Sequence, residues 1–379
     1  MRARPEGLPP YLPNTTRAQI NRATSPVIKP TRGGPQRLFP VAVPASISRG
    51  YALSQICCAG VSRPLVITTA FCYGPTELWP LLHSLEQHAP TAEVLVLTAQ
   101  EDLNRLAPLT ARFPHLSLEK VALPPRVIRG PLALPRKLAS RTKRWLRRRQ
   151  QQLIHEPSIA IEEARRFGLS TAHSHFLIRR FFWAKECLKQ QRWRDHTAVM
   201  LCDVRDVVVQ GDPFANVGKT LISGEEFGLL DACAINRQWI RDAYDHEQEQ
   251  LLLGKPALCA GVVIGSRDQI QLYLDLFCHD AMEMMRRHGT SCESNLDQAI
   301  HNKILRSPSD LQLIISTVNG TIATVGCVPA EAIEVPDNSG PVKVMGQIPT
   351  VIHQYDRRPV LVQHVQAKHG RECGYNSAP

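Results

Sequence analysis

The chain has 379 residues, of which 43% are hydrophobic, so it can bury one large α/β core or two smaller ones. It contains no run of about 18 uninterrupted apolar residues and no compact apolar segment at its N-terminus, which argues against a spanning helix and a secretory signal. The 11 cysteines form no CxxC pair, a pattern typical of reduced thiols, and we expect a cytoplasmic protein.

The net charge of +11 is concentrated in two stretches. Residues 1–60 are basic and rich in proline, which predicts a largely disordered leader. PRKLASRTKRWLRRRQQQ belongs to a basic, helical insert at about residues 124–155. This insert has three interpretations: a solvated helix, a peripheral contact with an anionic membrane on its inner face, or a nucleic-acid site. The sequence does not favour nucleic acid, because no binding module is recognisable around the insert.

Strands and helices alternate from residue 64 onward. PLVITTAF and AEVLVLTA are apolar and β-branched, which predicts strands, and ELWPLLHSLEQHAP between them has leucines at helical spacing. EDLNRLAPLTARF and LSLEKVAL predict a second helix and a third strand. This order predicts a Rossmann-like, mostly parallel sheet flanked by helices, within one domain at residues 61–368 that is followed by a tail at 369–379.

Two aspartates follow the next predicted strand. SHFLIRRFFWAKECLKQQ predicts a helix, and Ala198–Cys202 then predicts a buried strand with Asp203 at its carboxyl edge and Asp206 three residues later. Ligands of open parallel sheets bind at this edge, and two adjacent carboxylates need a cation, for which Mg²⁺ or Mn²⁺ is suited. In the alternative interpretation, Asp203 caps a turn and Asp206 pairs with Arg205 or another surface cation.

Three later segments carry further candidates. CAGVVIGS places Gly261 where a backbone can approach a ligand closely, although a tightly packed strand explains the glycine equally well. SNLDQAIHNKIL predicts a helix with Asp297 and Gln298 in its first turn, where an acid can also act only as a helix stabiliser. VIHQYD ends an apolar run on His353, whose neutral imidazole can bind a metal.

These segments together resemble the GT-A glycosyltransferases, which transfer a sugar from a nucleotide diphosphate donor, and they are distantly similar to the glycogenin-like members. The resemblance extends from about Leu65 to His364. The strand that ends at Asp203, with VVVQGDPF after it, resembles the metal-binding DxD segment, except that two residues instead of one separate the acids. The resemblance implies a GT-A type fold and a hexosyltransferase-like enzyme that uses Mn²⁺ or Mg²⁺.

The resemblance also implies roles for individual residues. Thr68, Thr69 and Ala70 would form a loop after the first strand that holds the nucleoside, and Arg180 or its neighbour Arg179 would reach the donor. Either Asp203 or Asp206 can be the direct metal ligand. The implied set comprises the metal ligands Asp203, Asp206 and His353, the donor-binding residues Thr68, Thr69, Ala70, Arg180, Asp203 and Gly261, and the catalytic residues Asp297 and Gln298. Glu225, Glu226 and Asp231 follow the DxD strand, and in an inverting reaction we expect one of them, with Glu226 as our choice, to act as the base for the acceptor hydroxyl.

The expected function is therefore metal-dependent transfer of a sugar from a nucleotide-diphosphate sugar to a glycan or lipid-linked acceptor, with inversion or retention left open. A nucleotidyltransferase that makes the sugar nucleotide is an alternative. It predicts a glycine-rich, basic loop after the first strand, whereas TTAFCYGPTE has one glycine and no lysine or arginine. A third alternative is a non-catalytic basic protein on the same fold, whose binding depends on residues 1–60 and 136–149 and not on Asp203.

Overall fold

The computed structural model describes residues 63–121, 176–288, 296–337 and 340–370, which belong to one compact unit, Cys58–Pro379. The predicted leader at 1–60 and most of the tail at 369–379 lie outside the described residues, as does the basic insert at 124–155. None of the helices in the described ranges has the length and apolar character that crossing a membrane requires. The described cysteines are all free thiols.

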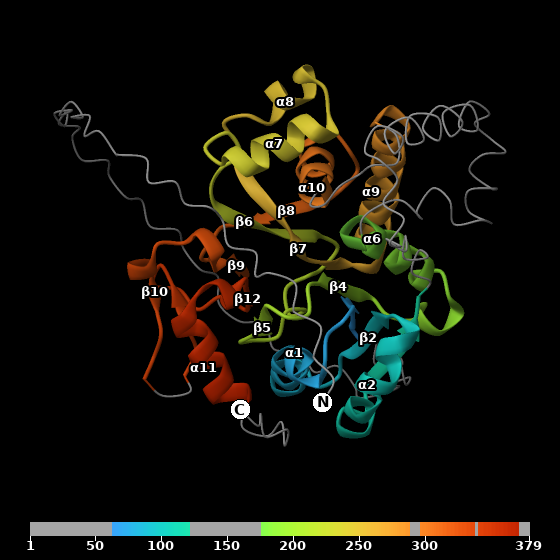
Figure 1. Cartoon of the computed structure of the whole chain (residues 1–379), viewed down its shortest axis with the longest axis vertical. Helices are drawn as coiled ribbons and strands as arrows, with labels where there is room; N and C mark the ends of the chain where they lie inside the picture. Colours follow the sequence, from blue (N-terminus) through green and yellow to red (C-terminus); the bar gives the residue numbers. More distant parts are fainter. Residues whose placement is uncertain (1–62, 122–175, 289–295, 338–339, 371–379) are drawn as a thin grey trace, which may run out of the picture. The chain divides into compact units, whose positions relative to one another are not determined.

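A mixed, mostly parallel sheet forms the centre of the unit (Figure 1). The strand order is β3-β2-β1-β4-β7-β6-β9-β12-β5, and β8 lies beside β6. The strands of this sheet are β1 Leu65–Ala70, β2 Glu93–Thr98, β3 Leu116–Lys120, β4 Ala198–Cys202, β5 Val207–Val209, β6 Leu221–Leu229, β7 Pro256–Ser266, β8 Leu313–Ser316, β9 Ile322–Thr324 and β12 Val351–His353. A separate two-stranded sheet contains β10 Ile333–Glu334 and β11 Lys343–Val344.

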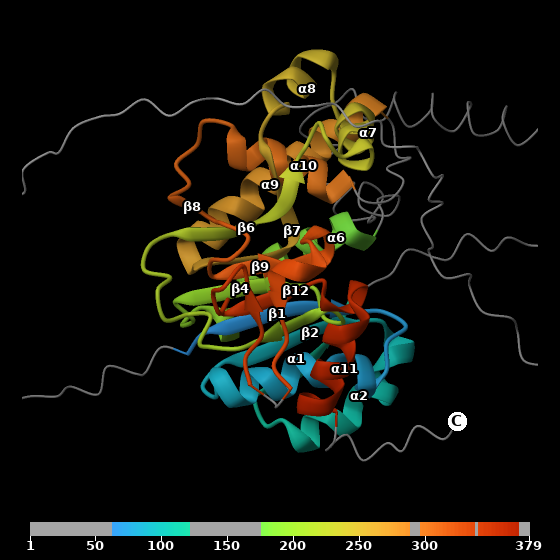
Figure 2. The ribbon, with the colours of Figure 1, turned by 90° about the vertical axis from the view of Figure 1, so that its left-hand side faces the viewer.

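Helices cover both faces of the sheet, as Figures 1 and 2 show. Alternate residues of β1 enter different cores, because successive strand side chains point to opposite faces. Leu65 and Ile67 pack in the core that contains the central helices, whereas Val66 packs in the core beneath the first two helices. The α-helices are α1 Pro75–His88, α2 Gln100–Arg112, α6 Phe176–Leu188, α7 Ala234–Ala243, α8 His246–Leu252, α9 Arg267–His288, α10 Leu296–Arg306 and α11 Pro359–His369.

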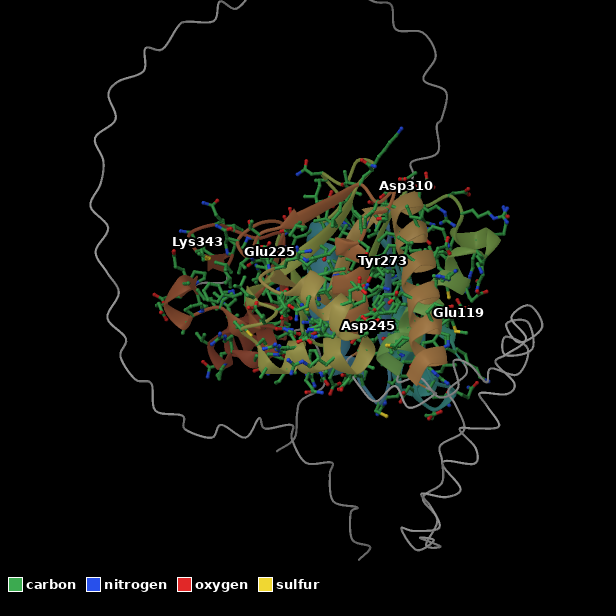
Figure 3. All side chains as sticks on the ribbon, turned by 90° about the horizontal axis from the view of Figure 1, so that it is seen from above. Glu119, Glu225, Asp245, Tyr273, Asp310 and Lys343 are labelled. Atoms are coloured by element: carbon green, nitrogen blue, oxygen red, sulfur yellow. The ribbon has the colours of Figure 1, made fainter. Side chains whose placement is uncertain are left out.

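An aromatic cluster fixes α6 against α9. Phe181 of α6 stacks on Phe277 of α9 with ring centroids 3.9 Å apart, and Tyr273 meets Phe181 edge-on at 6.0 Å. Tyr273 is fully buried and lies at the centre of the unit, as Figure 3 shows. Because α6 cannot slide without breaking this packing, the residues on its neighbouring face are held over the ends of β1 and β4.

The α/β architecture with a mostly parallel central sheet confirms the prediction from the alternating pattern. One detail of the prediction is wrong. Thr68, Thr69 and Ala70 are the last three residues of β1 and not a loop, because they pair with Val96–Thr98 of β2. The sheet is also not parallel throughout, since β7 runs antiparallel to both β4 and β6. Helix α11 extends to His369, one residue beyond the predicted end of the domain.

Candidate metal centre

Strand pairing brings the two aspartates and His353 together from distant parts of the chain. Asp203 directly follows β4, and its backbone N–H donates to the Gly261 carbonyl of β7 at 2.8 Å. Asp206 directly precedes β5. His353 is the last residue of β12, which pairs with β5 so that His353 stands opposite Val207. The three side chains therefore converge at the end of β4, as predicted for Asp203 and Asp206.

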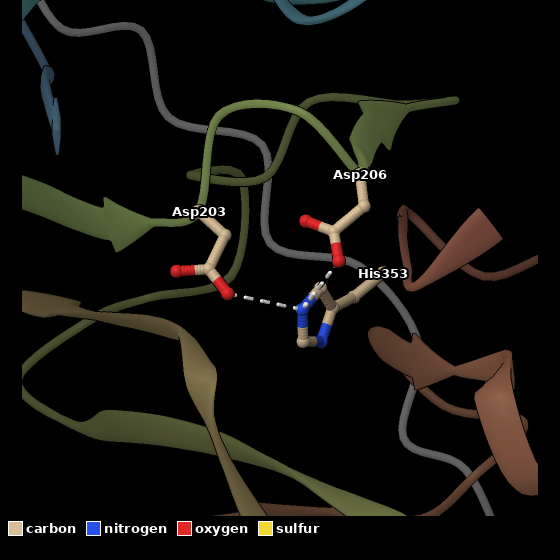
Figure 4. Close-up of side chains that lie close together, drawn as sticks. All are labelled: Asp203, Asp206 and His353. Atoms are coloured by element: carbon tan, nitrogen blue, oxygen red, sulfur yellow. Dashed lines mark ion pairs between the residues drawn. The ribbon is translucent and has the colours of Figure 1, made fainter. Parts of the chain in front are cut away.

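The three side chains form a compact set of potential metal ligands. His353 Nε2 lies 3.5 Å from Asp203 Oδ2 and 3.7 Å from Asp206 Oδ2, and Figure 4 shows both carboxylates directed at the imidazole ring. One ligand atom from each residue lies within 4.8 Å of the other two. His353 is only 1% exposed, and its Nε2 atom is buried without a hydrogen-bond partner. A buried nitrogen without a partner between two carboxylates fits a site for a cation.

The electrostatics of the cluster show an excess of negative charge. Burial raises the pKa of Asp206 to about 6, and the charge of Asp203 adds to this shift against the opposing effect of His353. Burial also acts on Asp203, but Arg180 and His353 outweigh it and lower the Asp203 pKa to about 2. Burial lowers the pKa of His353, yet the surrounding charges, Asp206 and Asp203 among them, raise it well above 6.5. The site thus favours positive charge.

The glycine at 261 makes room for this arrangement. A Cβ atom at this position would lie 2.2 Å from His353 Cε1 and 2.8 Å from Asp203 Oδ2, far inside normal contact distances. The predicted close approach at Gly261 is therefore present, and the groups that approach the backbone are the side chains of His353 and Asp203. Any larger residue here would displace a candidate metal ligand.

Arg180 connects the cluster with Asp297. Its Nη1 donates to Asp203 Oδ1, and its Nη2 donates to Asp297 Oδ2 and to the Ala260 carbonyl, each at 3.1 Å. Asp297 lies in the first turn of α10, as the sequence indicated. The structure therefore places Arg180 at the cluster, whereas Arg179 is 3% exposed and makes no ion pair with the described residues. Two of the Arg180 nitrogens already bind protein oxygens.

Gln298 lies beside this cluster in a second polar network. Its Nε2 donates to Glu226 Oε2 at 3.2 Å and to Asn236 Oδ1 at 2.9 Å. On its other side, Gln298 Oε1 is 3.9 Å from Cys259 Sγ, which in turn is 3.6 Å from His353 Nδ1. The three predicted catalytic residues, Asp297, Gln298 and Glu226, thus lie in a connected set of contacts that begins at the candidate metal ligands.

A small cavity of about 20 Å³ lies at the carboxyl half of β1, which is room for about one water molecule. Thr68 and Thr69 line it together with Arg180 and Ala260, so three of the predicted donor-binding residues share one cavity. Ala70 does not line it. Ala70 is fully buried in the core under α1, which removes its side chain from any ligand.

Two further residues, Tyr73 and Asp356, were not predicted from the sequence. Burial raises the pKa of Tyr73; Arg205 opposes this shift, and the charges of Asp206 and Asp203 add to it. Tyr73 follows β1, so the rule that ligands bind at the carboxyl edge could have identified it. Asp356 forms an ion pair with Arg205 at 2.5 Å. Arg205 therefore pairs with Asp356, which disfavours the alternative that Asp206 is simply its surface partner.

Comparison with models of known protein families finds no match to this chain, and comparison with curated proteins finds no similar sequence. A function must therefore be inferred from the side chains of the site and their arrangement.

Proposed function

We propose that this chain is a metal-dependent glycosyltransferase with a GT-A type fold, which moves a sugar from a nucleotide diphosphate donor to a glycan or lipid-linked acceptor. The observation that carries the proposal is the convergence of Asp203, Asp206 and His353 at the carboxyl end of β4. Substrates of open α/β sheets bind at this edge, where a metal held by the protein can also meet phosphate oxygens.

The charges around the cluster fit a divalent cation. Asp203, Asp206 and Asp297 contribute three carboxylates, two of them half-buried and one buried, and Arg180 is the permanent cation that contacts Asp203 and Asp297. A divalent ion together with Arg180 balances all three negative charges once His353 is neutral. The imidazole ligand favours Mn²⁺ over Mg²⁺, since Mg²⁺ prefers oxygen ligands alone.

Asp203, Asp206 and His353 would hold the ion. When bound, the ion neutralises the diphosphate and thereby favours its departure. Thr68 and Thr69 line a small cavity together with Arg180, and this closeness to the cluster supports a role in placing the donor. Arg180 connects Asp297 to the cluster, and Cys259 connects Gln298 to His353. These contacts support roles for Asp297 and Gln298 beside a sugar attached to the diphosphate.

Glu226 is the carboxylate best suited to take the proton of an acceptor hydroxyl. It is half-buried, it accepts a hydrogen bond from Gln298, and it forms no ion pair with the described residues. A carboxylate within reach of the acceptor can take the hydroxyl proton as the hydroxyl oxygen attacks the sugar carbon. In an inverting reaction, Glu226 would act as this general base.

The proposal is tested by thermal unfolding with UDP or GDP, each with and without Mn²⁺. We expect stabilisation by a nucleoside diphosphate only when Mn²⁺ is present, because the ion held by these residues would supply the positive charge that the diphosphate needs. Asp203→Ala and Asp206→Ala should each abolish this stabilisation, whereas Asp242→Ala, on the exposed side of α7, should leave it unchanged.

Each of the other outcomes points to a different function. Stabilisation by nucleoside triphosphates but not diphosphates would favour a nucleotidyltransferase. Unchanged unfolding in the presence of every nucleotide, with or without Mn²⁺, would leave no support for a nucleotide-sugar enzyme and would favour a non-catalytic protein.

A further inference from the structure

We propose that Thr324 is a positioning residue that orients His353 for metal binding: its hydroxyl oxygen accepts a hydrogen bond from the Nδ1–H of the imidazole. The proposal rests on the metal centre proposed above. Thr324 neither belongs to the ligand set nor carries a charge, and its place in the sequence gives no sign of this role. Its position in the sheet suggests it.

Thr324 and His353 are neighbours across two parallel strands. Thr324 ends β9, His353 ends β12, and the two residues are register partners. Both are 1% exposed, so water cannot replace either one as a hydrogen-bond partner of the other. The Thr324 hydroxyl oxygen lies 3.4 Å from His353 Nδ1. Cys259 Sγ lies 3.6 Å from the same nitrogen and is the competing partner.

The protonation pattern required of His353 follows from its surroundings. Nε2 faces Asp203 and Asp206, so this nitrogen must offer its lone pair to a bound cation. The ring proton of the metal-bound imidazole is then on Nδ1, which needs an acceptor because it is buried. The hydroxyl oxygen of Thr324 is a good acceptor, whereas a thiol sulfur is a weak one.

The thiol of Cys259 can donate its hydrogen bond to Gln298 instead of His353. Glu226 decides this, because it fixes the orientation of the Gln298 amide group. A carboxylate can only accept a hydrogen bond, so the group of Gln298 that faces Glu226 must be its NH₂. The Gln298 oxygen therefore faces Cys259, where it lies 3.9 Å from Sγ and can accept the S–H proton. The sulfur itself already accepts a hydrogen bond from Gln354 Nε2 at 3.8 Å. Thr324 is therefore the better acceptor for His353 Nδ1–H.

Loss of such an outer partner weakens metal binding by a factor of about 10–100 in other metal sites. Thr324→Val removes the hydroxyl while preserving the β-branched shape, so we expect Mn²⁺ affinity to fall by that factor. Thr324→Ser restores the hydroxyl and should return the affinity to that of the unmodified chain. Thr220→Val is the matched control, because it removes a hydroxyl that bonds to the Val217 carbonyl in a loop away from the cluster.

The experiment is a Mn²⁺ titration of the full-length chain followed by electron paramagnetic resonance, which counts free Mn²⁺ directly. Proton NMR of the unmodified, metal-free chain provides a second readout that does not depend on any variant folding. The Nδ1 proton of His353 should appear as a slowly exchanging signal with a nuclear Overhauser contact to Thr324. His353→Ala serves as the reference for a lost metal ligand.

Mn²⁺ binding by Thr324→Val at the affinity of the unmodified chain would overturn the inference. A larger loss of Mn²⁺ affinity in Cys259→Ala than in Thr324→Val would overturn it as well, because it would identify the thiol as the partner of Nδ1. A rapidly exchanging Nδ1 proton without contact to Thr324 would also contradict it. If His353→Ala retains full Mn²⁺ affinity, the metal centre itself is wrong, and this outcome separates failure of the proposed function from failure of the role of Thr324.

Discussion

Replacing Gly261 by alanine tests the packing on which the metal centre depends. The new Cβ atom would lie 2.2 Å from His353 Cε1, 2.4 Å from His353 Nε2 and 2.8 Å from Asp203 Oδ2. Favourable contacts between carbon atoms begin at about 3.5 Å, so the imidazole has to retreat by roughly 1 Å or more. The stiff backbone of β7, paired on both sides, leaves the side chain of His353 as the group that moves.

The expected loss of affinity follows from this displacement. Ligand distances in a working metal site vary by only about 0.2 Å, so a shift of roughly 1 Å removes His353 from the ligand set. Loss of an outer partner alone costs a factor of about 10–100, and loss of a direct ligand should cost at least about 100-fold, or about 2.8 kcal/mol. Overpacking should also lower the free energy of unfolding by about 1–3 kcal/mol.

Manganese titration and urea unfolding of Gly261→Ala measure both quantities. Gly211→Ala is the control, because its Cβ atom would lie 3.6 Å from Thr350 Cγ2, which is an ordinary contact. In a His353→Ala background the extra methyl group at 261 has space, so the cost in unfolding free energy should largely disappear. Mn²⁺ binding by Gly261→Ala at the affinity of the unmodified chain would refute the packing argument and the place of His353 in the ligand set.

Two further predictions concern stability. Burial raises the pKa of Asp206 to about 6, so the charged form of this side chain destabilises the folded protein at pH 8. Asp206→Asn should therefore raise the unfolding free energy of the metal-free protein at pH 8 by about 1–3 kcal/mol. The same substitution should abolish stabilisation by Mn²⁺. A lower melting temperature in metal-free Asp206→Asn would contradict this. Burial lowers the pKa of His301 to about 3. Between pH 6.5 and pH 3 the unfolded chain therefore binds a proton that the folded chain does not. The unfolding free energy should fall as the pH drops through this range, by about 2 kcal/mol at pH 5. Urea unfolding at pH 7 and pH 5 measures this decrease, and an equally steep decrease in His301→Gln would show that another group is responsible.

The spacing of apolar residues along the chain predicted those strands and helices that bury a clear apolar face. Strands β1, β2 and β4 and helices α1 and α6 were predicted because their apolar residues recur at strand or helix spacing. Strand β6 was not predicted. Its residues LISGEEFGL contain two glycines and two adjacent glutamates, and they form a strand because β7 and β8 pair with them. Pairing between distant segments overrides weak local preference.

Asn302 shows how tertiary structure changes the meaning of a motif. Asn302 lies in SNLDQAIHNKIL, the segment that also carries Asp297 and Gln298. In the structure it is fully buried, and its amide group bonds to both the N–H and the C=O of Leu258 at 2.8 Å. These bonds attach α10 to β7, so Asn302 holds Asp297 and Gln298 in place instead of contacting a ligand itself.

The sequence by itself determined that Asp203 and Asp206 stand at the carboxyl edge of a buried strand, because that strand is defined by five consecutive residues of the chain. Only the tertiary structure decided that His353 joins them. Its approach depends on antiparallel pairing of β12 with β5 and on the absence of a side chain at Gly261. Sheet order and close packing are properties of the whole chain, and a short stretch of sequence carries too little information to specify them.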